Sequence, residues 1–219
     1  MNQTSEPKVE GNGLFPTPMM HLTFPDSQRI NGELSAVITK RMADHPSNNH
    51  SNLGGWQSSW DLSEWGGDAF QEVLGHAKKV ATRMTCNREG KAMRVDWGHN
   101  AWANVNGPGD SNEFHTHPGA FWSGTYYVDD GGISDDPSLG GEFEIQDPRG
   151  ITPAMYSPLL AFNIPGGPAA GVTEKIIPQA GTMLIFPSFV SHAVRPYRGD
   201  RQRISIAFNL TVRSSEPAI

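Results

Sequence analysis

The chain has 219 residues, a formal net charge of −6 at pH 7 and 18% charged residues, which is a composition typical of globular proteins. Its length allows one large domain or two small ones with a sizeable core, and the lack of a basic stripe argues against a nucleic-acid partner. The single cysteine, Cys86, excludes an intrachain disulfide, and no apolar stretch approaches the roughly 18 residues of a membrane span, so we expect a cytoplasmic protein without a membrane segment.

We expect one domain over residues 1–219, made of three consecutive parts. Residues 1–13 are polar and contain glycine, so they are predicted to form a flexible tail. Residues 14–90 are predicted to form a helical front, and residues 91–213 a β-barrel core.

Two helices are predicted in the front part. The first lies at about 33–44, where apolar residues recur at helical spacing: Leu34, Val37, Ile38 and Met42. The second lies at about 67–85, where one apolar face is formed by Phe70, Val73, Leu74, Ala77, Val80, Ala81 and Met84. Between them, residues 45–62 are rich in Asn, Ser and Gly, which predicts a long loop.

From about residue 92 the pattern changes to short apolar or alternating runs broken by Gly, Pro and Asp. About eight strands are predicted, at 92–97, 100–106, 121–128, 141–147, 157–164, 181–187, 192–197 and 203–212. A series of strands without helices between them is typical of a jelly roll. The expected fold class is mainly β with flanking helices (α+β), a double-stranded β-helix or cupin-like barrel with the two N-terminal helices packed on one sheet.

Two histidines one residue apart suggest part of a metal site. His115 and His117 project to the same face if their segment is extended, because side chains in a strand alternate. His192 follows an apolar strand, Pro187 and a short turn, and it begins another predicted strand. We expect His192 to face the histidine pair across the barrel.

The order of these motifs resembles the iron- and 2-oxoglutarate-dependent oxygenase superfamily, and more narrowly a family of bacterial and phage oxygenases of unknown substrate. The resemblance covers about residues 95–212. It rests on a pattern W-x-N-x-N … G … H-x-H-P … S-G-x-Y-Y, present here as Trp102, Asn104, Asn106, Gly109, His115, His117, Pro118, Ser123, Gly124, Tyr126 and Tyr127.

The resemblance implies an Fe(II)- and 2-oxoglutarate-dependent oxygenase that uses O2 to hydroxylate an unidentified small molecule or peptide. His115, His117 and His192 are then expected to hold Fe(II) and to be the catalytic residues, with positions left for the cosubstrate and O2. 2-Oxoglutarate chelates iron through its keto-acid end, so its distal carboxylate requires a cation. Arg203 follows His192 by eleven residues, a spacing typical of the superfamily.

The strand that contains Arg203 alternates between a polar and an apolar face. Arg203, Ser205, Ala207 and Asn209 share the face expected to line the barrel, and the face expected to lie under the helices holds Ile204, Ile206 and Phe208. The guanidinium of Arg203 can hold the distal carboxylate, and the hydroxyl of Ser205 can donate a further hydrogen bond to the same carboxylate. In prolyl-hydroxylase-like relatives the second tyrosine of a YY pair binds the same carboxylate, which assigns Tyr127 to the cosubstrate.

His117 departs from the superfamily pattern, which has H-x-D or H-x-E. Three interpretations follow: a three-histidine site, a site in which one histidine of the pair is a ligand and Glu113, Asp129 or Glu144 fills the third place, or a site that is degenerate or binds another ion.

Two other functions fit parts of the sequence. A cupin-like metalloenzyme that does not use 2-oxoglutarate has the same barrel, but its glutamate ligand falls here on Phe121 or Trp122. A β-barrel that binds a ligand without catalysis is the other alternative. For the oxygenase we expect Trp102, Phe121 and Trp122 at the entrance, specificity in loops 45–62 and 129–141, and a homodimer.

Overall fold

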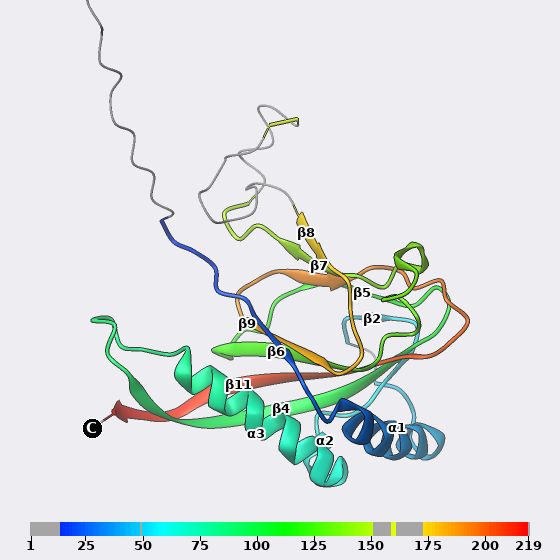
Figure 1. Cartoon of the computed structure of the whole chain (residues 1–219), viewed down its shortest axis with the longest axis horizontal. Coiled ribbons are helices and arrows are strands. Elements are labelled where there is room, and N and C mark those ends of the chain that lie inside the picture. The colour runs from blue at the N-terminus through cyan, green and yellow to red at the C-terminus, as the bar shows by residue number, and fades with distance from the viewer. Residues whose placement is uncertain (1–13, 49, 151–158, 161–172, 219) are drawn as a thin grey trace, which may run out of the picture.

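The computed structural model describes residues 14–48, 50–150, 159–160 and 173–218 (Figure 1). Its elements in chain order are β1 (Met20–Thr23), α1 (Ser27–Asp44), β2 (Asn52–Leu53), β3 (Trp56–Gln57), α2 (Leu62–Trp65), α3 (Gly67–Arg83), β4 (Met93–Asn106), β5 (Ser111–His115), β6 (Trp122–Asp129), η1 (Pro137–Leu139), β7 (Phe143–Gln146), β8 (Thr173–Ile176), β9 (Thr182–Pro187), β10 (His192–Val194) and β11 (Arg203–Pro217).

The strands of the described residues form two sheets that pack face to face. The major sheet has the order β1-β9-β6-β11-β4-β3, and the minor sheet has the order β2-β5-β10-β7-β8. Tyr127 and Phe186 of the major sheet pack against Phe143 of the minor sheet, so an apolar cluster joins the two. The predicted fold class, a double-stranded β-helix with flanking helices, is confirmed, with two separate sheets rather than a closed barrel.

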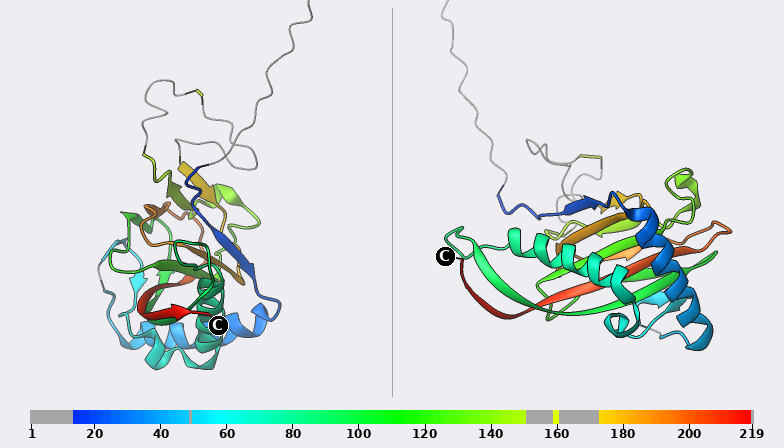
Figure 2. Two further views of the ribbon diagram at one scale, coloured as in Figure 1. Left: turned by 90° about the vertical axis from the view of Figure 1, so that its left-hand side faces the viewer. Right: turned by 60° about the horizontal axis from the view of Figure 1, so that its bottom comes forward.

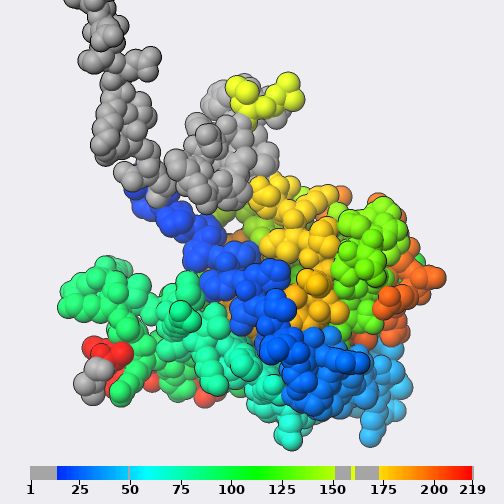
Figure 3. All heavy atoms as spheres, viewed as in Figure 1, coloured from blue at the N-terminus to red at the C-terminus, as the bar shows by residue number. Residues whose placement is uncertain are grey.

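Helices α1 and α3 cover the outer face of the major sheet, which is the face turned away from the minor sheet (Figure 2). The two helices contact each other across this side of the molecule (Figure 3). The buried stripe of α1 is Ile30, Leu34 and Ile38, spaced one helical turn apart. These side chains join one core with Ile206 and Phe208 of β11, as the alternation of that strand predicts.

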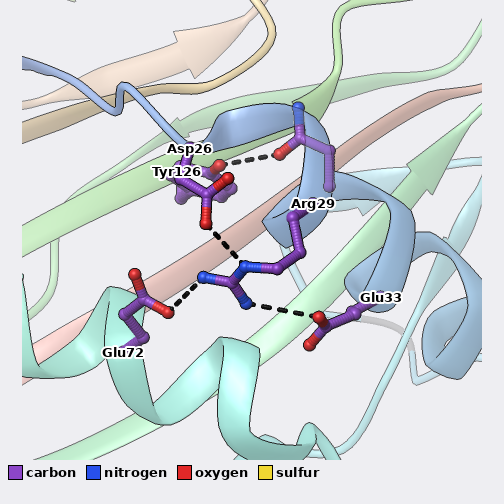
Figure 4. Close-up of polar contacts among 6 residues, drawn as sticks. Asp26, Arg29, Glu33, Glu72 and Tyr126 are labelled. Carbon is purple, nitrogen blue, oxygen red and sulfur yellow. Dashed lines mark hydrogen bonds and ion pairs between the residues drawn. The ribbon is translucent and has the colours of Figure 1, made fainter.

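Polar contacts at the helix surface supplement this packing (Figure 4). Arg29 of α1 binds Asp26 at 2.6 Å and Glu33 at 3.2 Å, and it reaches Glu72 of α3 at 2.7 Å. The hydroxyl of Tyr126 donates a hydrogen bond of 2.7 Å to the side-chain oxygen of Asn31. Exposed ion pairs of this kind each contribute about 0–1 kcal/mol, so the apolar stripe dominates the stability of this side.

Several predicted boundaries are wrong. Helix α1 begins at Ser27 rather than near residue 33, because Ile30 extends the buried stripe by one turn and Gly32 is tolerated inside the helix. The predicted strands 92–97 and 100–106 are one strand, β4, which pairs with β11 along its whole length. The predicted loop 45–62 contains β2 and β3, whose two-residue length leaves no periodic signal.

Other expectations lie partly outside the described residues or are not tested. The predicted strand 157–164 falls outside them except for residues 159–160, and β1 and β8 were not predicted. Within the described part of the chain, no helix has both the length and the apolar character of a membrane span. The division at residues 13, 90 and 213, the homodimer and the cytoplasmic location stay predictions.

Candidate metal centre

Three histidines converge between the two sheets. His115 ends β5 and His192 begins β10, and the two residues are register partners on adjacent strands. His117 follows β5, and its backbone N–H donates to the carbonyl of Ser188 at 3.0 Å. The ring centroids are 4.4 Å apart for His115 and His192, 5.0 Å for His115 and His117, and 5.1 Å for His117 and His192. One ring nitrogen from each histidine lies within 4.8 Å of the other two, so all three can bind one ion.

Backbone carbonyls orient two of the imidazoles. A carbonyl oxygen only accepts, so His115 Nδ1–H donates to Glu113 at 2.7 Å and His192 Nδ1–H donates to Val190 at 2.8 Å. In a neutral imidazole the other nitrogen, Nε2, then carries the lone pair. Metal-binding histidines use this arrangement to fix the tautomer and the ring direction.

The three imidazoles favour their neutral form. Burial, together with repulsion from His115 and His117, lowers the pKa of His192 to about 3. Burial and the neighbouring His115 and His50 lower the pKa of His117 to about 4, and burial also lowers the pKa of His115. Neutral imidazole is the form that binds a metal, so this set of donors fits Fe(II).

The three carboxylates considered as replacements for His117 point elsewhere. The side chain of Glu113 is exposed, and Asp129 binds Arg201 at 3.2 Å. Glu144 lies 3.3 Å from the guanidinium of Arg195. No carboxylate joins the three histidines within the described ranges. The geometry therefore favours the three-histidine interpretation.

Arg203 is the most deeply buried charged residue on the inner face of the major sheet, which is the face turned toward the minor sheet. Only 1% of its surface is exposed. Its Nη1 donates to Asn106 at 3.2 Å and to Ser205 at 3.4 Å, whereas its Nε has no partner among the described residues. Burial lowers the pKa of Arg203. Asp130 partly offsets this effect, but no described carboxylate forms an ion pair with the guanidinium, so this site fits an anionic ligand.

Tyr127 lies beside this guanidinium. The guanidinium carbon of Arg203 is 5.5 Å from the centroid of the tyrosine ring, and Ser205 and Tyr127 are register partners. The Tyr127 hydroxyl is buried and has no hydrogen-bond partner in the described part of the chain. Burial raises its pKa to about 12, so it stays a donor. A carboxylate would accept hydrogen bonds from Arg203 and Tyr127 together, which is the arrangement expected for 2-oxoglutarate.

The aromatic residues expected at the entrance divide between two faces. Trp102 lies near the histidines, with its ring centroid 5.8 Å from that of His117. The expectation is wrong for Trp122, whose indole N–H donates to Thr85 at 2.9 Å on the helix-covered side, and Phe121 packs beside it. Sequence reasoning also gave no role to Asn106, although the W-x-N-x-N motif contains it and it binds Arg203.

Comparisons with known proteins identify the class that this fold and site define. A family model described as "Putative 2OG-Fe(II) oxygenase" matches residues 100–209, which is half of the chain. A prolyl-4-hydroxylase of Pseudomonas putida aligns with 18% identity and a TM-score of 0.59, covering 90% of this chain and 93% of its own. A search of curated proteins gives no match.

Two further prolyl hydroxylases share the fold. The enzyme of Trichoplax adhaerens, in complex with a peptide fragment of hypoxia inducible factor, aligns with 15% identity and a TM-score of 0.63, covering 88% of this chain and 83% of its own. The viral collagen prolyl hydroxylase of Paramecium Bursaria Chlorella virus-1, solved as a complex with 2OG, aligns with 12% identity and a TM-score of 0.53. The alignment covers 88% of this chain and 94% of the viral enzyme.

The chain belongs to the 2OG-Fe(II) oxygenase family. It is an iron- and 2-oxoglutarate-dependent dioxygenase, with Fe(II) as its cofactor, 2-oxoglutarate and O2 as its cosubstrates, and a small molecule or peptide as its substrate. The structural relatives, all below 20% identity, add support for the fold.

Proposed function

We propose that this oxygenase hydroxylates a C–H bond of its substrate, with iron held by His115, His117 and His192 and 2-oxoglutarate held by Arg203, Ser205 and Tyr127. One observation carries the proposal: three neutral imidazoles and a buried guanidinium that forms no ion pair with any described residue share the space between the sheets. The two groups are linked by packing. Phe143 and Phe186 contact the His192 ring, and Tyr127, beside Arg203, belongs to the same apolar cluster.

Each group of residues would have a distinct role in the reaction. The histidines present three neutral nitrogen donors and leave the remaining positions on the metal open. Arg203 and Tyr127 neutralise and orient the distal carboxylate. The apolar cluster around Phe143, Phe186 and Val190 limits the access of water. When bound, iron and 2-oxoglutarate supply the oxidation R–H + 2-oxoglutarate + O2 → R–OH + succinate + CO2.

The family match and the buried position of Arg203 favour the oxygenase over the alternatives. A cupin that does not use 2-oxoglutarate has no need for a buried guanidinium, and a passive ligand-binding barrel has no need for three converging imidazoles. The peptide in the Trichoplax structure is a ligand of that protein, and it makes peptides one class of candidate substrate to test here.

Anaerobic visible absorption tests the proposal. Adding 2-oxoglutarate to the protein with Fe(II) should produce a new absorption band, and admission of O2 should convert 2-oxoglutarate to succinate. Replacing His115 by alanine should remove the band together with bound iron. A protein that binds iron but gives neither band nor succinate would support the cupin-like alternative, and a protein that binds no metal would support the passive barrel.

A further inference from the structure

A row of polar side chains crosses the inner face of the major sheet. In register order it contains Gln57 on β3, Asn104 on β4, Ser205 on β11 and Tyr127 on β6. Register partners in a sheet project to the same face, so all four side chains point toward the minor sheet. The side chains of this row are buried, with exposed fractions of 2% for Gln57 and 8% for Asn104.

The two ends of this row differ in hydrogen-bonding chemistry. At one end, Tyr127 and the adjacent Arg203 have an unpartnered hydroxyl and an unpartnered N–H, which are donors suited to a carboxylate. At the other end, the unpartnered atoms are the amide oxygens of Asn104 and Gln57, which are acceptors. A carboxylate of 2-oxoglutarate offers only acceptors, so it does not satisfy these oxygens. An N–H or O–H group of a second ligand would satisfy them.

Asn104 lies between the two halves of the proposed site. Along β4, Trp102 packs near His117 on one side of it, and on the other side Asn106 binds Arg203. Residues two apart in a strand share a face, so Asn104 projects inward between the metal ligands and the cosubstrate cation. A group bound at Asn104 would therefore lie beside the reacting centre.

Gln57 extends this region to the edge of the sheet. It lies in the segment 45–62, where specificity was expected, and β3 is the edge strand beside β4. In the same segment, His50 packs edge-on against Trp60, with 5.5 Å between ring centroids, and the Trp60 side chain is half exposed. The segment thus combines one buried acceptor, Gln57, with an exposed aromatic ring.

We infer that Asn104 and Gln57 form the substrate subsite, and that their amide oxygens accept hydrogen bonds from an N–H or O–H group of the substrate. The inference rests on the proposed function, because it assigns the substrate end of the same site. It also gives a role to the first asparagine of the W-x-N-x-N motif. A ligand N–H or O–H would supply the hydrogen bond that the described residues do not give these two amide oxygens.

Thermal unfolding of the metal-free protein tests whether these amides are structural. Asn104→Leu removes an acceptor that has no partner, so the melting temperature should stay the same or rise by about 2–4 °C. Asn209→Leu is the matched control. Asn209 lies on the same face, is also 8% exposed, and accepts a 2.7 Å hydrogen bond from Ser123. Its replacement should lower the melting temperature by about 2–4 °C. Equal losses in both variants would overturn the inference.

NMR of the protein with Zn(II) and 2-oxoglutarate tests the predicted hydrogen bond. N-Methylacetamide, which has an N–H, should shift the side-chain amide signals of Asn104 and Gln57. N,N-Dimethylacetamide, which has none, should leave them unchanged, and Asn104→Leu should abolish the response to the first compound. Equal responses to both compounds, or to neither, would overturn the inference.

The same sample separates this inference from the proposed function. Binding of 2-oxoglutarate, followed by the Tyr127 and Arg203 signals, reports on the function itself. If 2-oxoglutarate binds but N-methylacetamide has no effect, the substrate subsite is wrong and the function stands. If 2-oxoglutarate does not bind, the proposed function is wrong. If Asn104→Leu weakens 2-oxoglutarate binding as much as Tyr127→Phe, the two amides belong to the cosubstrate site instead.

Discussion

The two faces of the major sheet use adjacent residues in opposite ways. Tyr126 points outward, where its hydroxyl donates to Asn31 of α1. Tyr127 points inward, where its hydroxyl has no partner. The contrast extends along β11, whose outward Ile206 and Phe208 pack in the helix-covered core, whereas its inward Arg203 is a buried charge.

This difference shows where the protein gives up stability for binding. Apolar burial on the outer face contributes roughly 25 cal/mol for each Å² removed from water. On the inner face, unpartnered polar atoms of Gln57, Asn104, Tyr127 and Arg203 oppose folding until ligands satisfy them. Substitutions of buried outer-face residues should therefore change stability, and substitutions of these four inner-face residues should change ligand binding.

The largest expected effect is the loss of metal from the inner face. His192→Ala removes one of three donors and should reduce bound iron from one equivalent to a small fraction, measured by metal analysis after desalting. His99→Ala is the control, because His99 lies on the outer face and its Nε2 pairs with Ser63. Undiminished iron in His192→Ala would show that the histidine cluster is not the iron site.

His117 departs from the superfamily pattern, and substitutions at this position test whether it is the third iron ligand. His117→Asp restores H-x-D and should retain iron, whereas His117→Ala should lose it. If both variants bind iron as the wild type does, His117 is not a ligand.

Removal of the guanidinium should be the next largest effect. Arg203→Met keeps most of the side-chain volume but removes the charge that pairs with the distal carboxylate. The loss of about 2–5 kcal/mol corresponds to 2-oxoglutarate binding weakened by about 30-fold to several-thousand-fold, with iron binding retained. Calorimetric titration measures this effect. Arg201→Met, at an exposed ion pair with Asp129, is the control and should bind normally.

A substitution on the outer face should lower stability and leave ligand binding unchanged. Leu34 is fully buried in the helix-covered core. Leu34→Ala should lower the free energy of unfolding by about 2–5 kcal/mol, as measured by urea denaturation, because it leaves a cavity. Iron and 2-oxoglutarate affinities of the folded fraction should not change. A weakened 2-oxoglutarate affinity at unchanged stability would contradict the division between the faces.

The smallest effects come from the two tyrosines. Tyr126→Phe should destabilise the protein by about 1 kcal/mol and leave 2-oxoglutarate binding unchanged. Tyr127→Phe should leave stability in the absence of ligand unchanged and weaken 2-oxoglutarate binding by about 2- to 10-fold. Paired thermal unfolding and titration of both variants measure the contrast, and the reverse pattern would show that the faces are misassigned.

The alternation of polar and apolar residues correctly predicted the two faces of β11, because the alternation of a single long strand is local information. The resemblance to oxygenases suggested the set His115, His117, His192 and Arg203, and the YY pair of prolyl-hydroxylase-like relatives suggested Tyr127. The structure brings the three histidines together and buries Arg203 beside Tyr127. Their assignment as ligands awaits the substitutions above.

The polar row could not be derived from the sequence. Gln57 lies in a two-residue strand inside a segment that has the composition of a loop, and only pairing with β4 places it beside Asn104. Asn104 was visible in the motif, but its unpartnered oxygen depends on neighbours contributed by distant parts of the chain. Hydrogen-bond satisfaction is a property of the assembled sheet, and no local pattern encodes it.

Anomalous diffraction from crystals grown anaerobically with Fe(II) and 2-oxoglutarate tests the central claim most directly. The account predicts one strong iron peak bound by nitrogen atoms of His115, His117 and His192, with the distal carboxylate of 2-oxoglutarate on Arg203 and Tyr127. An iron peak away from the three histidines, or a cosubstrate that leaves Arg203 without an anion, would contradict it.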